Sequence, residues 1–273
     1  MRVAHSAKPS RSLLTALAGV CSAVLLAFLA VPCLSLLLNV RSGEIWQALR
    51  EDYVRQALVL TLRTSILAAL LCAILGTPVA YVLARGSFPG KRVVDALVQL
   101  PLVLPPVVSG VALLMAFGRR GLLGAHLSAW GIEIPFTAAA VVMAQVFMAA
   151  PFFVVAVRNG LAAVPPTLEE ASRTLGASEL RTFARVTLPL TWPAFASGLV
   201  LCWGRAIGEF GATITFAGNM PGTTRTMTLA VLTAMQGDLN GALVLSVLLL
   251  VFSSALFLAA AVILQPLRLA AHA

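Results

Sequence analysis

The residues with the clearest chemical potential are Arg205 and Glu209, which carry opposite charges four positions apart in an apolar segment. On a helix, side chains at this spacing lie on one face and can form an ion pair. Ionisable groups at membrane depth are costly and generally face the protein interior or a water-filled path. Two roles remain open for the pair: a structural contact where helices cross, or a lining or gating group of a conduit. Because Glu209 would repel an anion, we do not expect it to be a ligand for an anionic substrate.

Other residue types that do chemistry are poorly placed for it. The three histidines lie outside the apolar segments, so we expect no histidine-based catalytic or metal centre within the membrane. The cysteines lack C-x-x-C spacing, and we expect small buried hydrophobic side chains rather than a disulfide or a metal site. The four cysteines are Cys21, Cys33, Cys72 and Cys202. No G-x-x-x-x-G-K-[ST] phosphate loop is present, so we expect neither ATP hydrolysis nor a bound cofactor in this chain.

The composition excludes a soluble or peripheral enzyme. Of the 273 residues, 60% are hydrophobic and only 11% are charged, whereas soluble domains carry roughly 25% charged residues. The net charge of +9 could suggest nucleic-acid binding. However, the basic residues are scattered among apolar runs and form no basic helix face, so membrane topology explains the excess more simply.

We therefore expect an all-α polytopic membrane protein with about six transmembrane helices, each needing about 20 residues. The predicted spans are 13–38, 64–84, 93–117, 136–157, 193–216 and 241–264. A cleaved signal peptide is the alternative for the first span, but its apolar run exceeds the roughly 7–15 residues of such a peptide. Prolines at 101, 105 and 106 interrupt the third span, and a membrane helix tolerates them where neighbouring protein satisfies the freed backbone groups.

The distribution of Lys and Arg predicts the orientation. With the amino terminus inside, eleven basic residues fall in inner segments and seven in outer ones, and cytoplasmic loops collect such residues. Both termini should then be cytoplasmic. We divide the chain into 1–54, which holds the tail, the first span and an outer interfacial segment, and 55–265, the core. The interfacial segment should extend over 41–63, before the second span, and the long internal loop of the core is 158–191.

That loop is patterned as a helix-turn-helix. Thr167 with Glu170 fits a capping box, Gly176 suits the left-handed residue that ends a helix, and Ser178 can cap a second short helix. Apolar residues recur at helical spacing on both helices, and these are Leu168, Ala171, Leu175, Leu180, Phe183 and Ala184. Such an amphipathic pair must bury its apolar face, either under its own membrane helices or against a cytoplasmic partner.

The spacing in this loop resembles the EAA motif of membrane subunits of ATP-binding-cassette importers. Glu170-Ala171-Ser172 is followed by three residues, Gly176, nine residues and Val186-Thr187-Leu188-Pro189. Ser172 and Val186 depart mildly from the Ala and Ile of that pattern. The resemblance implies that the loop is a coupling helix pair that fits into a cleft on a separate ATPase subunit. The docking residues it implies are Glu170, Ala171, Ser172, Gly176, Val186, Leu188 and Pro189.

A second resemblance concerns the substrate. The run from Gly208 to Gly222, followed by Arg225-Thr226, and Phe136-Thr137 before the fourth span are similar to the permeases of molybdate importers. Sulfate and thiosulfate permeases share a related Gly-Glu-Phe-Gly stretch, so a sulfate permease remains the alternative, and tungstate is inseparable from molybdate. From helix irregularity we expect the translocation path or gate near the broken third and fifth spans. The candidates are Pro105, Pro106, Arg205, Gly208, Glu209, Gly211 and Asn219.

The resemblance implies a homodimeric pore in a bacterial inner membrane, a cytoplasmic ATPase dimer that uses ATP, and an extracytoplasmic oxyanion-binding protein. A self-sufficient secondary carrier is the rival from a different class. It would need several ion-relay groups inside the membrane, whereas only Arg205 and Glu209 lie deep, with Asp95 and Arg63 near span ends. We also find no inverted repeat, which disfavours the carrier.

Overall fold

The protein is known from a computed structural model that describes residues 10–270, with side-chain surroundings for 15–259. Within this range every regular element is helical, as expected for an all-α protein. The tail residues Arg2 and Lys8 and both chain ends lie outside the described residues. The helices are α1 (Ser10–Leu38), α2 (Ser42–Ala48), α3 (Asp52–Arg85), α4 (Lys91–Val103), α5 (Pro106–Phe117), α6 (Gly124–Ala129), α7 (Ala138–Ala163), α8 (Pro166–Thr174), α9 (Glu179–Thr182), the π-helical turn η1 (Phe183–Thr187), α10 (Leu188–Ile207), α11 (Gly211–Phe216), α12 (Met227–Met235) and α13 (Leu239–Ala270).

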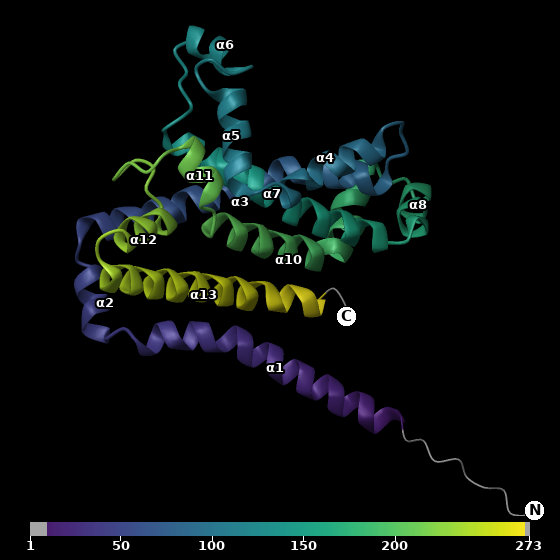
Figure 1. Ribbon diagram of the computed structural model, residues 1–273. Coiled ribbons are helices and arrows are strands. Elements are labelled where there is room, and N and C mark those ends of the chain that lie inside the picture. The colour runs from purple at the N-terminus through teal and green to yellow at the C-terminus, as the bar shows by residue number, and fades with distance from the viewer. Residues whose placement is uncertain (1–9, 271–273) are drawn as a thin grey trace, which may run out of the picture.

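The long helices α3, α7, α10 and α13 form the body of the molecule, with α7 packed against both α3 and α10 (Figure 1). Their core is built from small and aromatic side chains, including the buried Ala68 and Phe153. A Cβ atom at Gly76 would lie 2.9 Å from the Phe153 ring, so a glycine is needed for this close helix packing. Helix α1 diverges from the body (Figure 1) and its span is unburied in the isolated chain.

Among the described residues, five helices are long and apolar enough to cross a membrane, or six if α4 and α5 count as one broken span. The prediction of about six spans is therefore confirmed. The third predicted span is not a single helix, because α4 and α5 meet at an angle of 120°. Pro105 and Pro106 donate no backbone hydrogen bond, and Leu104, which precedes them, adopts an extended backbone. The interruption was predictable from the prolines, but its angle was not.

The second span begins earlier than predicted. Helix α3 starts at Asp52, and its buried residues Val54, Ala57 and Thr61 continue the face that packs into the body. The prediction that 41–63 is an interfacial segment is therefore wrong for 52–63, and only α2 remains separate. The domain boundary that we place after residue 54 falls in the first turn of α3, and that division stays a prediction.

The fifth span is also broken, since α10 ends at Ile207 and α11 starts at Gly211. Of the cysteines, Cys72 and Cys202 are buried between α3 and α10 as expected, whereas Cys21 and Cys33 are exposed. The prediction of burial is wrong for the latter two because α1 has little packed around it within this chain.

Candidate coupling loop and helix-break site

The connection between α7 and α10 folds into a helical pair, α8 and α9, that continues through η1 into α10. Gly176 has φ +86°, which confirms the left-handed residue after the first helix. The Ser178 hydroxyl accepts a hydrogen bond of 3.4 Å from the Arg181 amide, which confirms the second cap. The predicted capping box is wrong. Helix α8 already begins at Pro166, so Thr167 lies inside it and caps nothing.

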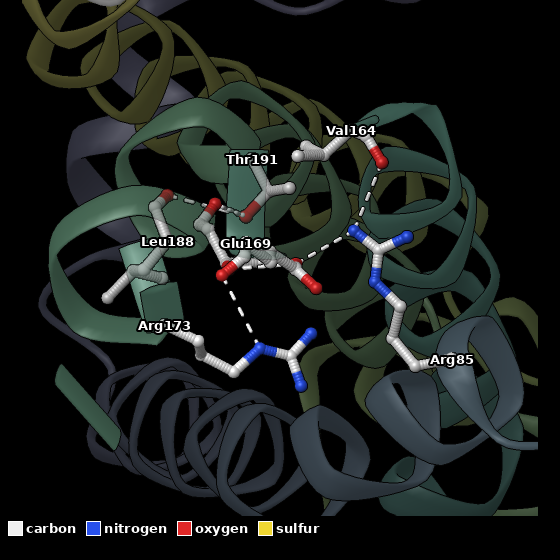
Figure 2. Close-up of polar contacts among 7 residues, drawn as sticks. Arg85, Val164, Glu169, Arg173, Leu188 and Thr191 are labelled. Carbon is white, nitrogen blue, oxygen red and sulfur yellow. Dashed lines mark hydrogen bonds and ion pairs between the residues drawn. The ribbon is translucent and has the colours of Figure 1, made fainter. Parts of the chain in front are cut away.

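A buried carboxylate, Glu169, fixes this loop to the membrane helices (Figure 2). Its Oε1 accepts hydrogen bonds from Arg85 Nη2 at 2.8 Å and from the Thr187 hydroxyl at 2.9 Å. The same Arg85 nitrogen donates to the Val164 carbonyl at 3.1 Å. One side chain therefore joins the end of α3, helix α8 and the turn η1.

The charges of this contact are largely withdrawn from water, with 17% of the Arg85 side chain and 8% of the Glu169 side chain exposed. A buried charge is costly unless it is paired and hydrogen-bonded, and each of these two charges neutralises the other, while Arg85 Nε is left without a hydrogen-bond partner among the described residues. Arg173 adds a hydrogen bond of 3.4 Å from Nε to the Glu169 carbonyl oxygen. Sequence reasoning missed Glu169, because its partner Arg85 is 84 positions away and no local spacing relates them.

Three leucines of the helical pair remain uncovered by the described residues. Leu175 and Leu180 are 89% and 79% exposed, and Leu168 is 45% exposed. Phe183, in contrast, packs edge-on against Tyr81 with ring centroids 5.7 Å apart. Of the two alternatives for the apolar face, packing under the membrane helices holds for Phe183 but not for these leucines.

The residues of the EAA-like motif occupy this same helical pair and the start of α10. Glu170 and Ala171 are exposed on α8, next to the buried Glu169. The Ser172 hydroxyl lies 3.0 Å from the Thr182 hydroxyl and so connects α8 to α9. The remaining members differ in burial: Gly176 and Pro189 are exposed, while Val186 and Leu188 are half-buried.

A second candidate site lies where the two broken spans cross. A Cβ atom on Gly211 would come within 2.7 Å of Pro106 Cβ, and one on Gly110 would come within 2.8 Å of the Ala212 carbonyl oxygen. Pro105 precedes α5 as its N-terminal flanking residue. The structure therefore brings the break before α5 against the break before α11, with glycines permitting the contact.

The ion pair between Arg205 and Glu209 spans the break between α10 and α11. Arg205 Nη1 lies 2.7 Å from Glu209 Oε2, and the Glu209 side chain has no exposed surface. The other oxygen, Oε1, accepts a hydrogen bond of 2.8 Å from the Ala212 amide in the first turn of α11. The predicted pairing is confirmed. A Cβ atom on Gly204 would meet no atom within 4 Å and one on Gly208 would meet only the Gly204 carbonyl, so no other helix packs closely against either glycine among the described residues.

The segment after α11 forms a hydrogen-bonded loop around Asn219. The Asn219 amide donates to the Thr233 hydroxyl at 2.9 Å, and its Oδ1 accepts from Arg225 Nε at 2.9 Å. Gly218 has φ +75°, and a Cβ atom there would lie 3.0 Å from the ring of Phe136. The two segments that resemble molybdate permeases, around 136 and around 219, therefore touch. Sequence reasoning did not find Thr233 as a partner of Asn219.

Apolar spans, two of them broken, and an anchored helical pair at one end define this chain as a polytopic membrane protein. The family model described as "Binding-protein-dependent transport system inner membrane component" matches residues 76–269. The chain belongs to that family.

Curated relatives cover most of the chain. It is 42% identical over 227 residues to the molybdenum transport system permease protein ModB of Mycobacterium tuberculosis, covering 83% of this chain and 86% of that protein. Identity to the Escherichia coli K12 protein of the same name is 47% over 182 residues, covering 66% of this chain and 80% of that protein. A probable sulfate transport system permease protein of Chlorokybus atmophyticus is 36% identical over 211 residues, covering 77% of this chain and 74% of that protein.

Solved structures support the fold. A bacterial ABC transporter involved in the import of the acidic polysaccharide alginate superposes with a TM-score of 0.73 at 18% identity. The match covers 93% of this chain and 95% of that chain. The fold is therefore that of a type I ABC importer permease.

Proposed function

We propose that this chain is the permease subunit of an ATP-driven importer of molybdate, with tungstate as an equivalent tetrahedral oxyanion. The observation that supports the substrate most directly is the identity of 42–47% to molybdenum permeases over most of the chain. The contact of Phe136 with Gly218 adds to it, because it joins the two segments that resemble those permeases. A sulfate or thiosulfate permease is the alternative, and the relative with that description is less similar.

The energy comes from a separate cytoplasmic ATPase dimer that docks on the helical pair α8–α9. This proposal rests on the leucines Leu175 and Leu180, which are 89% and 79% exposed in the described part of the chain. The implied docking set lies on this pair and on the segment that follows it into α10, and it consists of Glu170, Ala171, Ser172, Gly176, Val186, Leu188 and Pro189. An amphipathic helix that places its apolar side in a groove is a common mode of recognition.

Two copies of the chain form the pore, and an extracytoplasmic binding protein delivers the oxyanion to its outer mouth. ATP binding draws the two ATPase subunits and their docked loops together and favours the outward-facing state. Hydrolysis releases them and favours the inward-facing state. Each ligand shifts the equilibrium only by its difference in affinity for the two states.

Glu169 is the residue that couples displacement of the docked loop to the membrane-spanning helices. Because its carboxylate holds both Arg85 at the end of α3 and Thr187 in the turn η1, directly before α10, displacement of α8 is passed to two long helices. A loop attached only through flexible segments would move without moving the spans.

The crossing of the two helix breaks is the proposed wall or gate of the path. It includes Pro105, Pro106, Gly208 and Gly211, and the Arg205–Glu209 pair holds its second break together. Asn219 shapes the adjacent loop through Arg225 and Thr233. The chain lies in the inner membrane, and we propose that both termini are cytoplasmic, on the side of α8.

Transport by the complete complex tests the substrate. Proteoliposomes containing the chain, its ATPase and its binding protein should accumulate radioactive molybdate with ATP, and unlabelled molybdate or tungstate should compete. A hundred-fold excess of sulfate should leave uptake nearly unchanged. Equal competition by sulfate would favour the sulfate alternative.

Crosslinking tests the docking surface. A Leu175→Cys variant should form a disulfide with a cysteine placed in the cleft of the ATPase, because residue 175 projects fully from the loop. Leu122→Cys is the matched control, since Leu122 is 83% exposed but lies between α5 and α6. Equal crosslinking of both variants, or none at residue 175, would argue against docking there.

A further inference from the structure

A cavity of about 810 Å³ lies between the end of α3, the start of α4 and the end of α7. The end of α3, the start of α4 and the end of α7, which form it, lie at the same end of the bundle as α8 (Figure 1). Its size falls within the range of roughly 300–1,000 Å³ that is typical of small-ligand sites. Nothing in the proposed transport cycle uses this cavity.

The cavity is lined by both basic and apolar residues. Lys91, Arg92 and Arg158 line it together with a single acid, Asp95. Arg158 is neutralised by an ion pair with Asp95. Lys91 Nζ donates only to the Gly86 carbonyl at 2.9 Å, and Arg92 has no ion-pair partner among the described residues. Two positive charges therefore remain uncompensated.

The apolar lining residues include Leu83, Phe88 and Val93, which come from α3, the loop before α4 and α4 itself. A soluble anion would gain nothing from these side chains. An amphiphile with a negative head and a hydrocarbon portion would contact both kinds of lining residue. The ends of membrane helices also lie at the depth of lipid headgroups, where the polar and apolar parts of such a molecule separate.

We propose that this cavity binds the phosphodiester headgroup of an anionic phospholipid, with Lys91 and Arg92 as the principal contacts and the glycerol portion against Phe88. Basic pockets between membrane helices on the cytoplasmic side suit such headgroups. Since Arg85, which ends α3, also binds Glu169, the lipid sits next to the anchor of the coupling loop. A bound lipid would therefore stabilise the end of α3 that the loop moves.

Lipid retention tests the site on the purified permease–ATPase complex. After extraction from nanodiscs that contain equal amounts of phosphatidylglycerol and phosphatidylcholine with matched acyl chains, native mass spectrometry should find phosphatidylglycerol retained preferentially. Affinity should fall about five-fold for Arg92→Gln and again for Lys91→Gln, the factor that corresponds to about 1 kcal/mol for each cation near anionic lipid. Arg120→Gln is the matched control, because Arg120 is an exposed arginine in the predicted outer segment.

A variant that binds the lipid more tightly separates a loss of the site from a loss of folding. Asp95→Asn releases Arg158 from its ion pair and should raise phosphatidylglycerol affinity about five-fold, which a damaged protein would not do. Equal retention of the two lipids by the wild type, or equal loss in Arg92→Gln and Arg120→Gln, would overturn the proposal. Displacement of the lipid by millimolar inorganic phosphate or molybdate would also overturn it, by assigning the cavity to a soluble anion.

Discussion

Replacement of Glu169 by glutamine should destabilise the chain strongly, although the change alters one atom. The variant retains the shape of the side chain and an oxygen that can accept from Arg85 Nη2, but it leaves the largely buried Arg85 guanidinium without a counter-charge. Removing one member of a buried ion pair costs about 3–5 kcal/mol. Because 17% of Arg85 remains exposed to water, we expect the lower end, about 3 kcal/mol.

The double variant Arg85→Met/Glu169→Gln distinguishes the cost of leaving Arg85 unpaired from other effects of the glutamine. With no cation left unpaired, it should recover about 2 kcal/mol of the loss, since neutral replacements of buried ion pairs are often tolerated. For a chain of this size, 3 kcal/mol corresponds to a decrease in Tm of about 6–12 °C. Glu170→Gln is the matched control, because Glu170 is the exposed neighbour in the same helix, and its Tm should be unchanged.

Two buried cysteines of the protein can report thermal unfolding in this assay. Cys72 and Cys202 are 1% and 0% exposed, so a thiol-reactive fluorophore labels them only on unfolding. The exposed Cys21 and Cys33 would first be replaced by serine. Equal Tm values for Glu169→Gln and Glu170→Gln, or a double variant no more stable than the single one, would refute the assignment of Glu169 as the buried anchor.

Substitutions of Glu169 and Glu170 should also have different effects on transport. In the complete complex, Glu169→Gln should preserve ATPase binding but lower the amount of molybdate taken up per ATP hydrolysed, because the docked loop no longer moves α3. Glu170→Lys should instead weaken ATPase binding, since it changes the exposed surface. A constant ratio of uptake to hydrolysis in Glu169→Gln would contradict the role proposed for the anchor.

Three further substitutions test the local geometry, each by the same thermal assay. Gly176→Ala should cost about 1–2 kcal/mol from left-handed strain alone, because a Cβ atom there meets no other group; an unchanged Tm would contradict the positive φ. Gly211→Ala should cost about 1–3 kcal/mol by overpacking, since its Cβ atom would press on Pro106; tolerance of leucine there would contradict the close crossing. Arg205→Gln should destabilise more than Glu209→Gln, because only the former leaves a fully buried carboxylate unpaired; the reverse order would contradict the pairing.

Features that depend on local sequence were predictable. Composition and run length gave the all-α class and about six spans, and the prolines at 105 and 106 marked a real break. Gly176 and Ser178 behave as their residue types require, because a left-handed turn and a helix cap are set by a few neighbouring atoms. The charges of Arg205 and Glu209 pair because helical spacing alone places them on one face.

Features that depend on contacts between distant segments were not predictable from the sequence. The carboxylate that anchors the loop is Glu169 and not its neighbour Glu170, because Glu169 lies on the side of α8 that faces Arg85. The sequence alone does not show which side of the helix that is. The capping box failed because Pro166 can occupy the first turn of a helix without losing a hydrogen bond. The 120° bend after α4 and the contact of Phe136 with Gly218 likewise follow from packing between distant segments.

The most direct measurement is ATP-dependent uptake of radioactive molybdate into proteoliposomes, with and without the ATPase subunit. We expect accumulation only when ATPase, ATP and the binding protein are all present, and only leakage-level entry with the chain alone, whatever proton or sodium gradient is imposed. Concentrative uptake by the chain alone would contradict the proposal that it is a conduit driven by another subunit, and would favour a secondary carrier.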